Sequence, residues 1–146
     1  ELEEGRLSIW ESTYNIFKDY PILGTGFGSF VYVFPAYSLR SNQAWVNHAH
    51  NDWLELLSDT GILGFVIVFS GVFYLSIFNL REILKTKSDS QIWIFLGGYT
   101  AILSIVIHSF VDFNLRTSAN AFLVAVIIGM LASFSKTTSE KVTGKR

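Results

Sequence analysis

The chain has 146 residues, of which half are hydrophobic, 16% are aromatic and 16% are charged, and its net charge is -1. Soluble domains usually carry about a quarter charged residues, so this composition and the mean hydropathy of +0.38 indicate a membrane protein. The near-neutral charge excludes the basic surface that nucleic-acid phosphates require, and no nucleic-acid partner is expected. The absence of cysteine excludes disulfides and thiolate metal sites. The chain starts at Glu1 without a signal segment, and we expect it to be a piece of a longer protein.

A helix is predicted near the amino-terminal end, from about Leu7 to Lys18. Apolar side chains recur there at three- and four-residue steps and so share one stripe of the helix: Leu7, Trp10, Tyr14 and Phe17. Pro21 ends the helix, because the residue before a proline is pushed out of the helical region. The loop "PILGTGFGSF" follows. Its GxGxG spacing has no flanking strand and helix, so a plain turn is favoured over a nucleotide site.

Helix is predicted to resume near Asp52. An aspartate there can cap the free amides of the first turn, and Glu55 three residues later completes an aspartate version of the capping box. The apolar residues that follow form a short helix that stops at Gly61. We expect this segment to lie near the membrane interface, where tryptophan and tyrosine concentrate.

Three membrane spans are predicted from uninterrupted apolar segments, at about 61–80, 91–111 and 119–134. At about 1.5 Å per residue, the first two match a hydrocarbon core of about 30 Å, and the third is short for it. The predicted fold is therefore an all-α polytopic membrane protein, with a loop region of short helices (1–60), three transmembrane helices (61–134) and a tail (135–146).

The orientation follows from the basic residues. Lysine and arginine collect in the loop at 81–90 and in the tail at 135–146, and basic segments favour the cytoplasmic side. Residues 1–60 and the turn at 112–118 are then expected on the outer face. In a Gram-negative cell, this places the loop 1–60 in the periplasm and the spans in the inner membrane.

The segment "HAHNDWLELLSDTGILGF" holds the densest group of ionisable residues, just before the first span. His48, His50 and Asp52 could bind a metal ion, but an HxH pair converges only on an extended segment and no third strong ligand is evident nearby. His50 alone could be a solvated loop residue, a histidine fixed at a helix start, or a catalytic base, because imidazole titrates near neutrality.

Three arginines are predicted on the outer face: Arg6, Arg40 and Arg116. Each presents a planar fork of donors that can grip a diphosphate, although a surface or interfacial role is favoured for any one of them taken singly. His108 and Asp112 lie four residues apart at the outer end of the second span, where they share a face if the helix continues. They could form a structural hydrogen bond or take part in catalysis.

The spacing His50-Asn51, nine residues, Gly61, two residues, Gly64 resembles the motif of the O-antigen ligase and polymerase superfamily. "GRLSIW", "DYPILGTGFGSF" and "HSFVDFNLRTSANAF" occur in the family's order, so the resemblance runs from about Gly5 to Ser133. The segment "RTSAN" departs from the family, which commonly has a histidine and a proline there.

The resemblance implies a metal-independent glycosyltransferase without cofactor that moves a glycan from undecaprenyl diphosphate to an acceptor, lipid A core in the case of a ligase. It implies that His50 activates the acceptor hydroxyl and that Arg6 binds the diphosphate. Asn51 would orient the histidine, Gly61 and Gly64 would allow close helix packing, and His48 would have a supporting role. The partners implied are the lipid-linked glycan, the acceptor glycolipid and membrane lipid, with the oligomeric state open.

Two alternatives stay open beside the ligase. The first is another transferase of the same class, a glycan polymerase or a protein O-oligosaccharyltransferase. The second is a non-catalytic membrane subunit that binds or transports a glycan.

Overall fold

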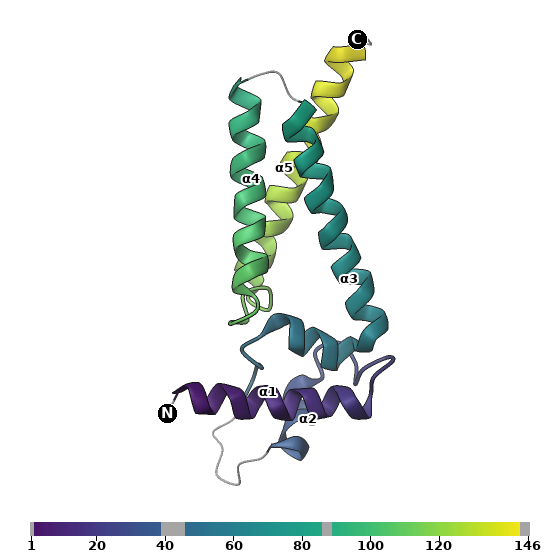
Figure 1. Cartoon of the computed structure of the whole chain (residues 1–146), viewed down its shortest axis with the longest axis vertical. Helices are drawn as coiled ribbons and strands as arrows, with labels where there is room; N and C mark the ends of the chain where they lie inside the picture. The colour runs from purple at the N-terminus through teal and green to yellow at the C-terminus, as the bar shows by residue number, and fades with distance from the viewer. Residues whose placement is uncertain (1, 39–45, 86–88, 144–146) are drawn as a thin grey trace.

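The structure is a computed structural model that describes residues 2–38, 46–85 and 89–143. All regular structure in these ranges is helical: α1 (Leu2–Asp19), α2 (Phe30–Tyr37), α3 (Asp52–Lys85), α4 (Asp89–His108) and α5 (Ser118–Thr143). The helices α4 and α5 lie beside each other, the long part of α3 slants towards α4, and α1 lies crosswise at the end of this group where α3 begins (Figure 1). The predicted all-α architecture is confirmed.

The helix α1 is longer than predicted, and its buried face is offset from the predicted stripe. Leu7 is 61% exposed and Tyr14 is also exposed, whereas Ser12, Thr13 and Ile16 are buried. Small side chains allow α1 to lie close to its neighbours, and the Thr13 hydroxyl is satisfied by donating to the Ile9 carbonyl at 2.7 Å. The apolar core on this side joins α1 to α2 and to the segment before α3, through Ile16, Phe30, Phe34 and Ala49.

The segment 30–37 is aromatic-rich and weakly patterned, so its sequence predicts no helix there. Pro35 also removes a backbone donor. The structure nevertheless forms α2 there, with Pro35 inside its last turn. Phe30 and Phe34 stand one turn apart, with ring centroids 5.0 Å apart, and both are buried. Burying two aromatic rings outweighs the single backbone hydrogen bond that the proline removes so near the end.

The helix α3 is broken at Gly61, which has φ 61° and ψ -170°. The short first part, 52–60, lies beside α1, and the long second part slants towards α4, approaching it at the end far from Gly61 (Figure 1). The glycine loop supplies partners for the backbone groups freed at the break. Its hydrogen bonds are Thr25 N–H to Ser58 O (3.1 Å), Gly26 N–H to Asp59 O (2.8 Å), Ile62 N–H to Pro21 O (2.9 Å) and Leu63 N–H to Ile22 O (3.3 Å).

Glycine is required at two positions of this joint. A Cβ on Gly61 would collide with the Ile22 carbonyl, and a Cβ on Gly24 would collide with the backbone of Asp59. Both residues also have positive φ, which side chains disfavour. The glycine loop is thus a turn, as favoured from the sequence, whose specific task is to brace the break in α3.

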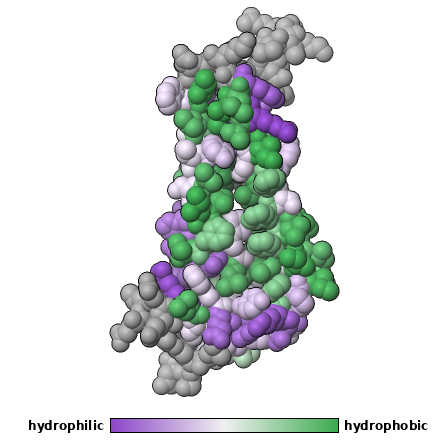
Figure 2. Space-filling view, viewed as in Figure 1, coloured by the Kyte–Doolittle hydropathy of each residue, from purple (hydrophilic) through white to green (hydrophobic). Residues whose placement is uncertain are grey.

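Within the part of the chain that the structure describes, two helices are long and apolar enough to cross a membrane, α3 and the part of α4 from Gln91 to His108. The apolar part of α5, Ser118–Phe134, is shorter, so the third predicted span stays a prediction. The second span was predicted to reach residue 111, but α4 ends at His108 and a turn follows. Apolar side chains dominate the visible middle of the molecule (Figure 2). Phe95, Ile102 and Leu131 form the core between α4 and α5.

Candidate active site

The predicted site residues that the structure describes gather mainly where the start of α3 meets the turn after α4. The Asp52 N–H donates to the carbonyls of Ser109 (2.9 Å) and Asp112 (3.2 Å). The Asp52 carboxylate accepts the Leu115 N–H at 2.8 Å. Trp53 adds a bond from its indole nitrogen to the Val106 carbonyl at 3.1 Å. These bonds fasten the turn to the helix start.

The cap of α3 is Asn51, and the prediction of an Asp52 cap is wrong. The Asn51 Oδ1 accepts the Leu54 N–H at 3.0 Å, as an N-cap residue does. The predicted capping box does not form either, because the Glu55 carboxylate reaches the Ala49 N–H at 2.7 Å instead. The side-chain oxygen of Asn51 is therefore committed to the helix start and does not orient His50.

His50 has φ 54°, a left-handed conformation that is uncommon outside glycine and costs about 1–3 kcal/mol where the surroundings must enforce it. Its Nδ1 lies 3.6 Å from Asp112 Oδ1, and its side chain is 35% exposed. This Nδ1 is buried and has no hydrogen-bond partner in the described part of the chain. The ring is therefore aimed at a carboxylate at one edge while the residue keeps access to solvent.

Asp112 lies between two histidines. His108 ends α4 and its Nε2 is 3.7 Å from Asp112 Oδ2, so the predicted proximity holds although the helix does not continue. The Phe113 N–H donates to the Asp112 carboxylate at 2.9 Å. This backbone hydrogen bond, with smaller contributions from His50 and His108, lowers the pKa of Asp112.

Phe113 is a site residue that sequence reasoning missed. The His48 ring stacks on it with centroids 4.8 Å apart, and the His50 ring meets it edge-on at 4.9 Å. One aromatic ring thus fixes the spacing of both imidazoles. The available signal was an aromatic residue next to Asp112 in a short turn between two spans.

Arg116 is held by two buried carboxylates. Its Nη2 lies 2.8 Å from Asp59 Oδ2, and its Nε lies 3.4 Å from Glu55 Oε1. The Phe27 ring covers the guanidinium at 5.0 Å. Asp59 was not singled out from the sequence, although its position one turn after Glu55 on a helix places both acids on the same face. The guanidinium predicted to bind a diphosphate is thus occupied within the fold.

The remaining predicted residues differ in their relation to this cluster. Arg6 is exposed on α1. Arg40 lies outside the described residues. The Nδ1 of His48 forms a hydrogen bond with Glu55 Oε1 at 3.1 Å, which places His48 beside His50 in a supporting position. Gly61 and Gly64 belong to the joint of α3 and its following turn, where a Cβ on Gly64 would collide with the Thr60 side chain.

No group of three histidine, aspartate or glutamate side chains within the described ranges is placed to hold a metal ion. The arrangement is instead that of paired imidazoles and carboxylates. Such pairs orient a ring nitrogen and can accept or hold a proton.

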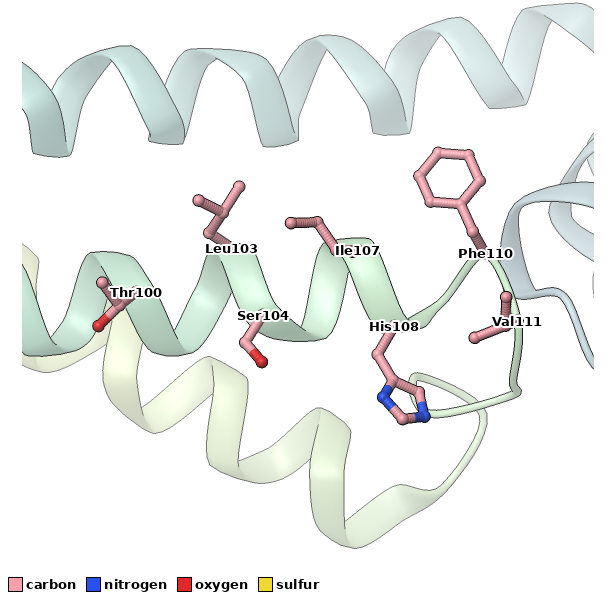
Figure 3. Close-up of a pocket in the computed structure, with 7 residues that line it drawn as sticks. All are labelled: Thr100, Leu103, Ser104, Ile107, His108, Phe110 and Val111. Carbon is pink, nitrogen blue, oxygen red and sulfur yellow. The ribbon is translucent and has the colours of Figure 1, made fainter.

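An apolar groove of about 780 Å³ begins at His108 and follows α4. In Figure 3, Leu103, Ile107 and Phe110 point towards α3, while His108 points towards the turn. The remaining lining residues are Thr100, Ser104 and Val111. The groove therefore joins an apolar bed to a polar end near Asp112.

Comparison with known protein families finds a match in the amino-terminal part of the chain. Residues 1–69 match the O-antigen ligase family. The match includes α1, α2, the glycine loop, His50 and the break in α3, and it ends before α4. No curated protein and no solved structure matches the chain.

The resemblance to the O-antigen ligase family is thus confirmed over this part of the chain. The match indicates a glycosyltransferase-like enzyme family with O-antigen ligase or polymerase type function, and lipid-linked glycans as the general class of substrate. Together with the two apolar helices, it indicates a membrane protein.

Proposed function

We propose that this chain forms part of a membrane glycosyltransferase that moves a glycan from undecaprenyl diphosphate to an acceptor, lipid A core in the case of a ligase. The observation that carries the proposal is His50, held in a left-handed conformation with Nδ1 facing the Asp112 carboxylate. Carboxylate–imidazole pairs of this kind leave the second ring nitrogen as the proton acceptor.

The proposed reaction is a single displacement. The acceptor hydroxyl oxygen attacks the anomeric carbon of the glycan, and His50 takes the hydroxyl proton as the new bond forms. The bond from that carbon to the diphosphate oxygen breaks, and undecaprenyl diphosphate leaves with the electron pair. No metal or other cofactor is part of this proposal, because arginines can balance the charge of the leaving group.

Arg6 and Arg40 are the proposed diphosphate ligands. Arg6 is exposed on α1, so its guanidinium is accessible to a ligand. Arg116 is the weaker candidate, because Asp59 and Glu55 already neutralise it. Its proposed contribution is to hold the two acids, and so the start of α3, in place.

The groove along α4 is the proposed bed for the carrier chain. Its lining is largely apolar, and its polar end at His108 adjoins Asp112. A lipid whose diphosphate lies near the histidines would thereby place its hydrocarbon among Leu103, Ile107 and Phe110. We further propose the bacterial inner membrane as the location, with His50 on the periplasmic side and the carboxyl-terminal tail in the cytoplasm.

The test replaces His50 in the full-length protein, expressed in cells that lack their own copy. His50→Asn removes the imidazole while keeping a residue that tolerates positive φ, and His50→Ala removes both properties. Arg6→Ala is tested beside them, and Glu11→Ala on the exposed face of α1 serves as the control. Lipopolysaccharide gels and protein levels are compared for all variants.

We expect both His50 variants and Arg6→Ala to lose the transferred glycan, while Glu11→Ala keeps it. Long carrier-linked chains left unattached would identify a ligase, and single repeats would identify a polymerase. Unchanged surface glycan in the His50 variants and in Arg6→Ala would overturn the catalytic proposal and favour a glycan-binding or transport subunit.

A further inference from the structure

Ala49, the residue directly before His50, is fixed on both sides. It is fully buried. Its N–H donates to Glu55 Oε2 at 2.7 Å, and its carbonyl accepts the indole N–H of Trp10 at 2.9 Å. The two peptide groups that flank Ala49 therefore cannot rotate without breaking a buried hydrogen bond.

This restraint bears directly on His50. A left-handed residue other than glycine persists only where neighbouring contacts determine its backbone. On the far side of His50, Asn51 caps α3 and the Asp52 N–H is bound to the turn after α4. The backbone is thus fixed before and after the histidine, and Glu55 provides the restraint on the side before it.

Glu55 binds more than the backbone. Its other oxygen, Oε1, lies 3.1 Å from His48 Nδ1 and 3.4 Å from Arg116 Nε. The Glu55 side chain is only 2% exposed, so these donors replace the water it lacks. A simple helix-start role does not account for this pattern, because none of these groups belongs to the first turn of α3.

We propose that Glu55 is a positioning residue for His50: its buried carboxylate clamps the His48–Ala49 segment so that the His50 ring faces Asp112. Arg116 supplies the opposite charge that holds this carboxylate in place. The inference rests on the catalytic role proposed for His50 above, and it assigns Glu55 no contact with the substrate.

The experiment measures glycan transfer and amide hydrogen exchange on the full-length protein purified in detergent. Glu55→Ala removes the clamp, Glu55→Gln keeps an acceptor for Ala49 but removes the charge, and Glu11→Ala removes an exposed acid from α1. Each substitution is also made in the His50→Asn background, which gives a double-mutant cycle. Exchange is followed in a peptide that covers residues 46–54.

Glu55→Ala is expected to lower kcat about 10- to 100-fold while KM for the lipid-linked donor stays within about twofold, because misplacement of a base affects the chemical step. Exchange of the Ala49 amide should quicken by at least about tenfold, because its acceptor is lost. Glu55→Gln should show a smaller change in both quantities, and Glu11→Ala should match the wild type.

The cycle separates the two proposals. If the His50 substitution itself leaves activity unchanged, the catalytic role of His50 is refuted, and with it the positioning role of Glu55. If His50 is required but Glu55→Ala keeps wild-type kcat or wild-type Ala49 exchange, the clamp proposal alone is overturned. An equal loss from Glu55→Ala with and without His50 also overturns it, since a positioning residue acts through its partner. If His50→Asn has no measurable activity, the hydrogen exchange of the Ala49 amide decides between the outcomes. If Glu55→Ala does not accumulate in cells, wild-type kcat and wild-type Ala49 exchange in Glu55→Gln would contradict the proposal.

Discussion

Replacing Gly61 by alanine tests the joint of α3. At φ 61° and ψ -170° the backbone adopts a conformation that is essentially restricted to glycine. Strain of this kind is about 1–3 kcal/mol. The new Cβ would also push away the Ile22 carbonyl, which accepts the Leu63 N–H. Each backbone hydrogen bond lost in the brace contributes a further ~1 kcal/mol.

A destabilisation of about 4 kcal/mol is therefore expected for Gly61→Ala. For a chain of this size it lowers the midpoint of thermal unfolding by about 10 °C. The assay is size-exclusion chromatography of the detergent-purified protein after heating. Glycan transfer should fall as well, because the joint at Gly61 holds the first part of α3, which begins directly after His50 and Asn51.

Gly71→Ala is the matched control. Gly71 lies in the same helix, and a Cβ there meets nothing within 4 Å. Alanine exceeds glycine in helix propensity by about 1 kcal/mol, so this variant should melt at the wild-type temperature or slightly above it. If Gly61→Ala melts within about 2 °C of Gly71→Ala, the brace is not what fixes the joint.

Two further substitutions probe the charges of the site. Arg116→Ala leaves Glu55 and Asp59 buried without their shared cation, and should destabilise the protein by about 3–5 kcal/mol in the same melting assay. A smaller loss of stability than that caused by Arg6→Ala, which replaces an exposed arginine, would refute the buried pairing. Asp112→Asn should lower the melting temperature at pH 7, because the native state depresses the pKa of this carboxyl chiefly through the Phe113 N–H. The stabilisation is present above the unfolded pKa and lost as pH falls through the folded one, so the difference between the two proteins should begin to shrink below about pH 4 and vanish once the pH is below the folded pKa. A difference that persists at lower pH would contradict this origin.

The parts of the fold that depend on local patterns could be predicted. The apolar runs at 61–80 and 91–111 predicted the two long helices, although the second ends earlier because Ser109 turns the chain back to Asp52. The helix α2 could not be foreseen, because its stability comes from burying Phe30 and Phe34 against α1. The exposure of Leu7 could not be foreseen either. Helical spacing shows which residues of α1 share a face, but it does not show which face packs against the other helices.

The candidate site divides in a similar way. His50 and Asn51 stood out by their spacing to the glycines, and His108 with Asp112 by their position at a span end. The pairings of His50 with Asp112 and of Arg116 with Asp59 depend on contacts between distant parts of the sequence, and Arg116 and Asp59 are 57 residues apart. A single sequence does not encode such pairings in any local pattern.

The break in α3 has a consequence for how the enzyme meets its lipid surroundings. A transmembrane helix changes its tilt when the bilayer becomes thicker or thinner. In an unbroken helix this rotation would be carried into the residues that follow His50. At Gly61 the Ile62 and Leu63 amides bind the glycine loop instead of the preceding turn, so the direction of the long part of α3 is set by that loop. A change of tilt in the long part of α3 would therefore load the bonds to the glycine loop before it reached residues 52–60.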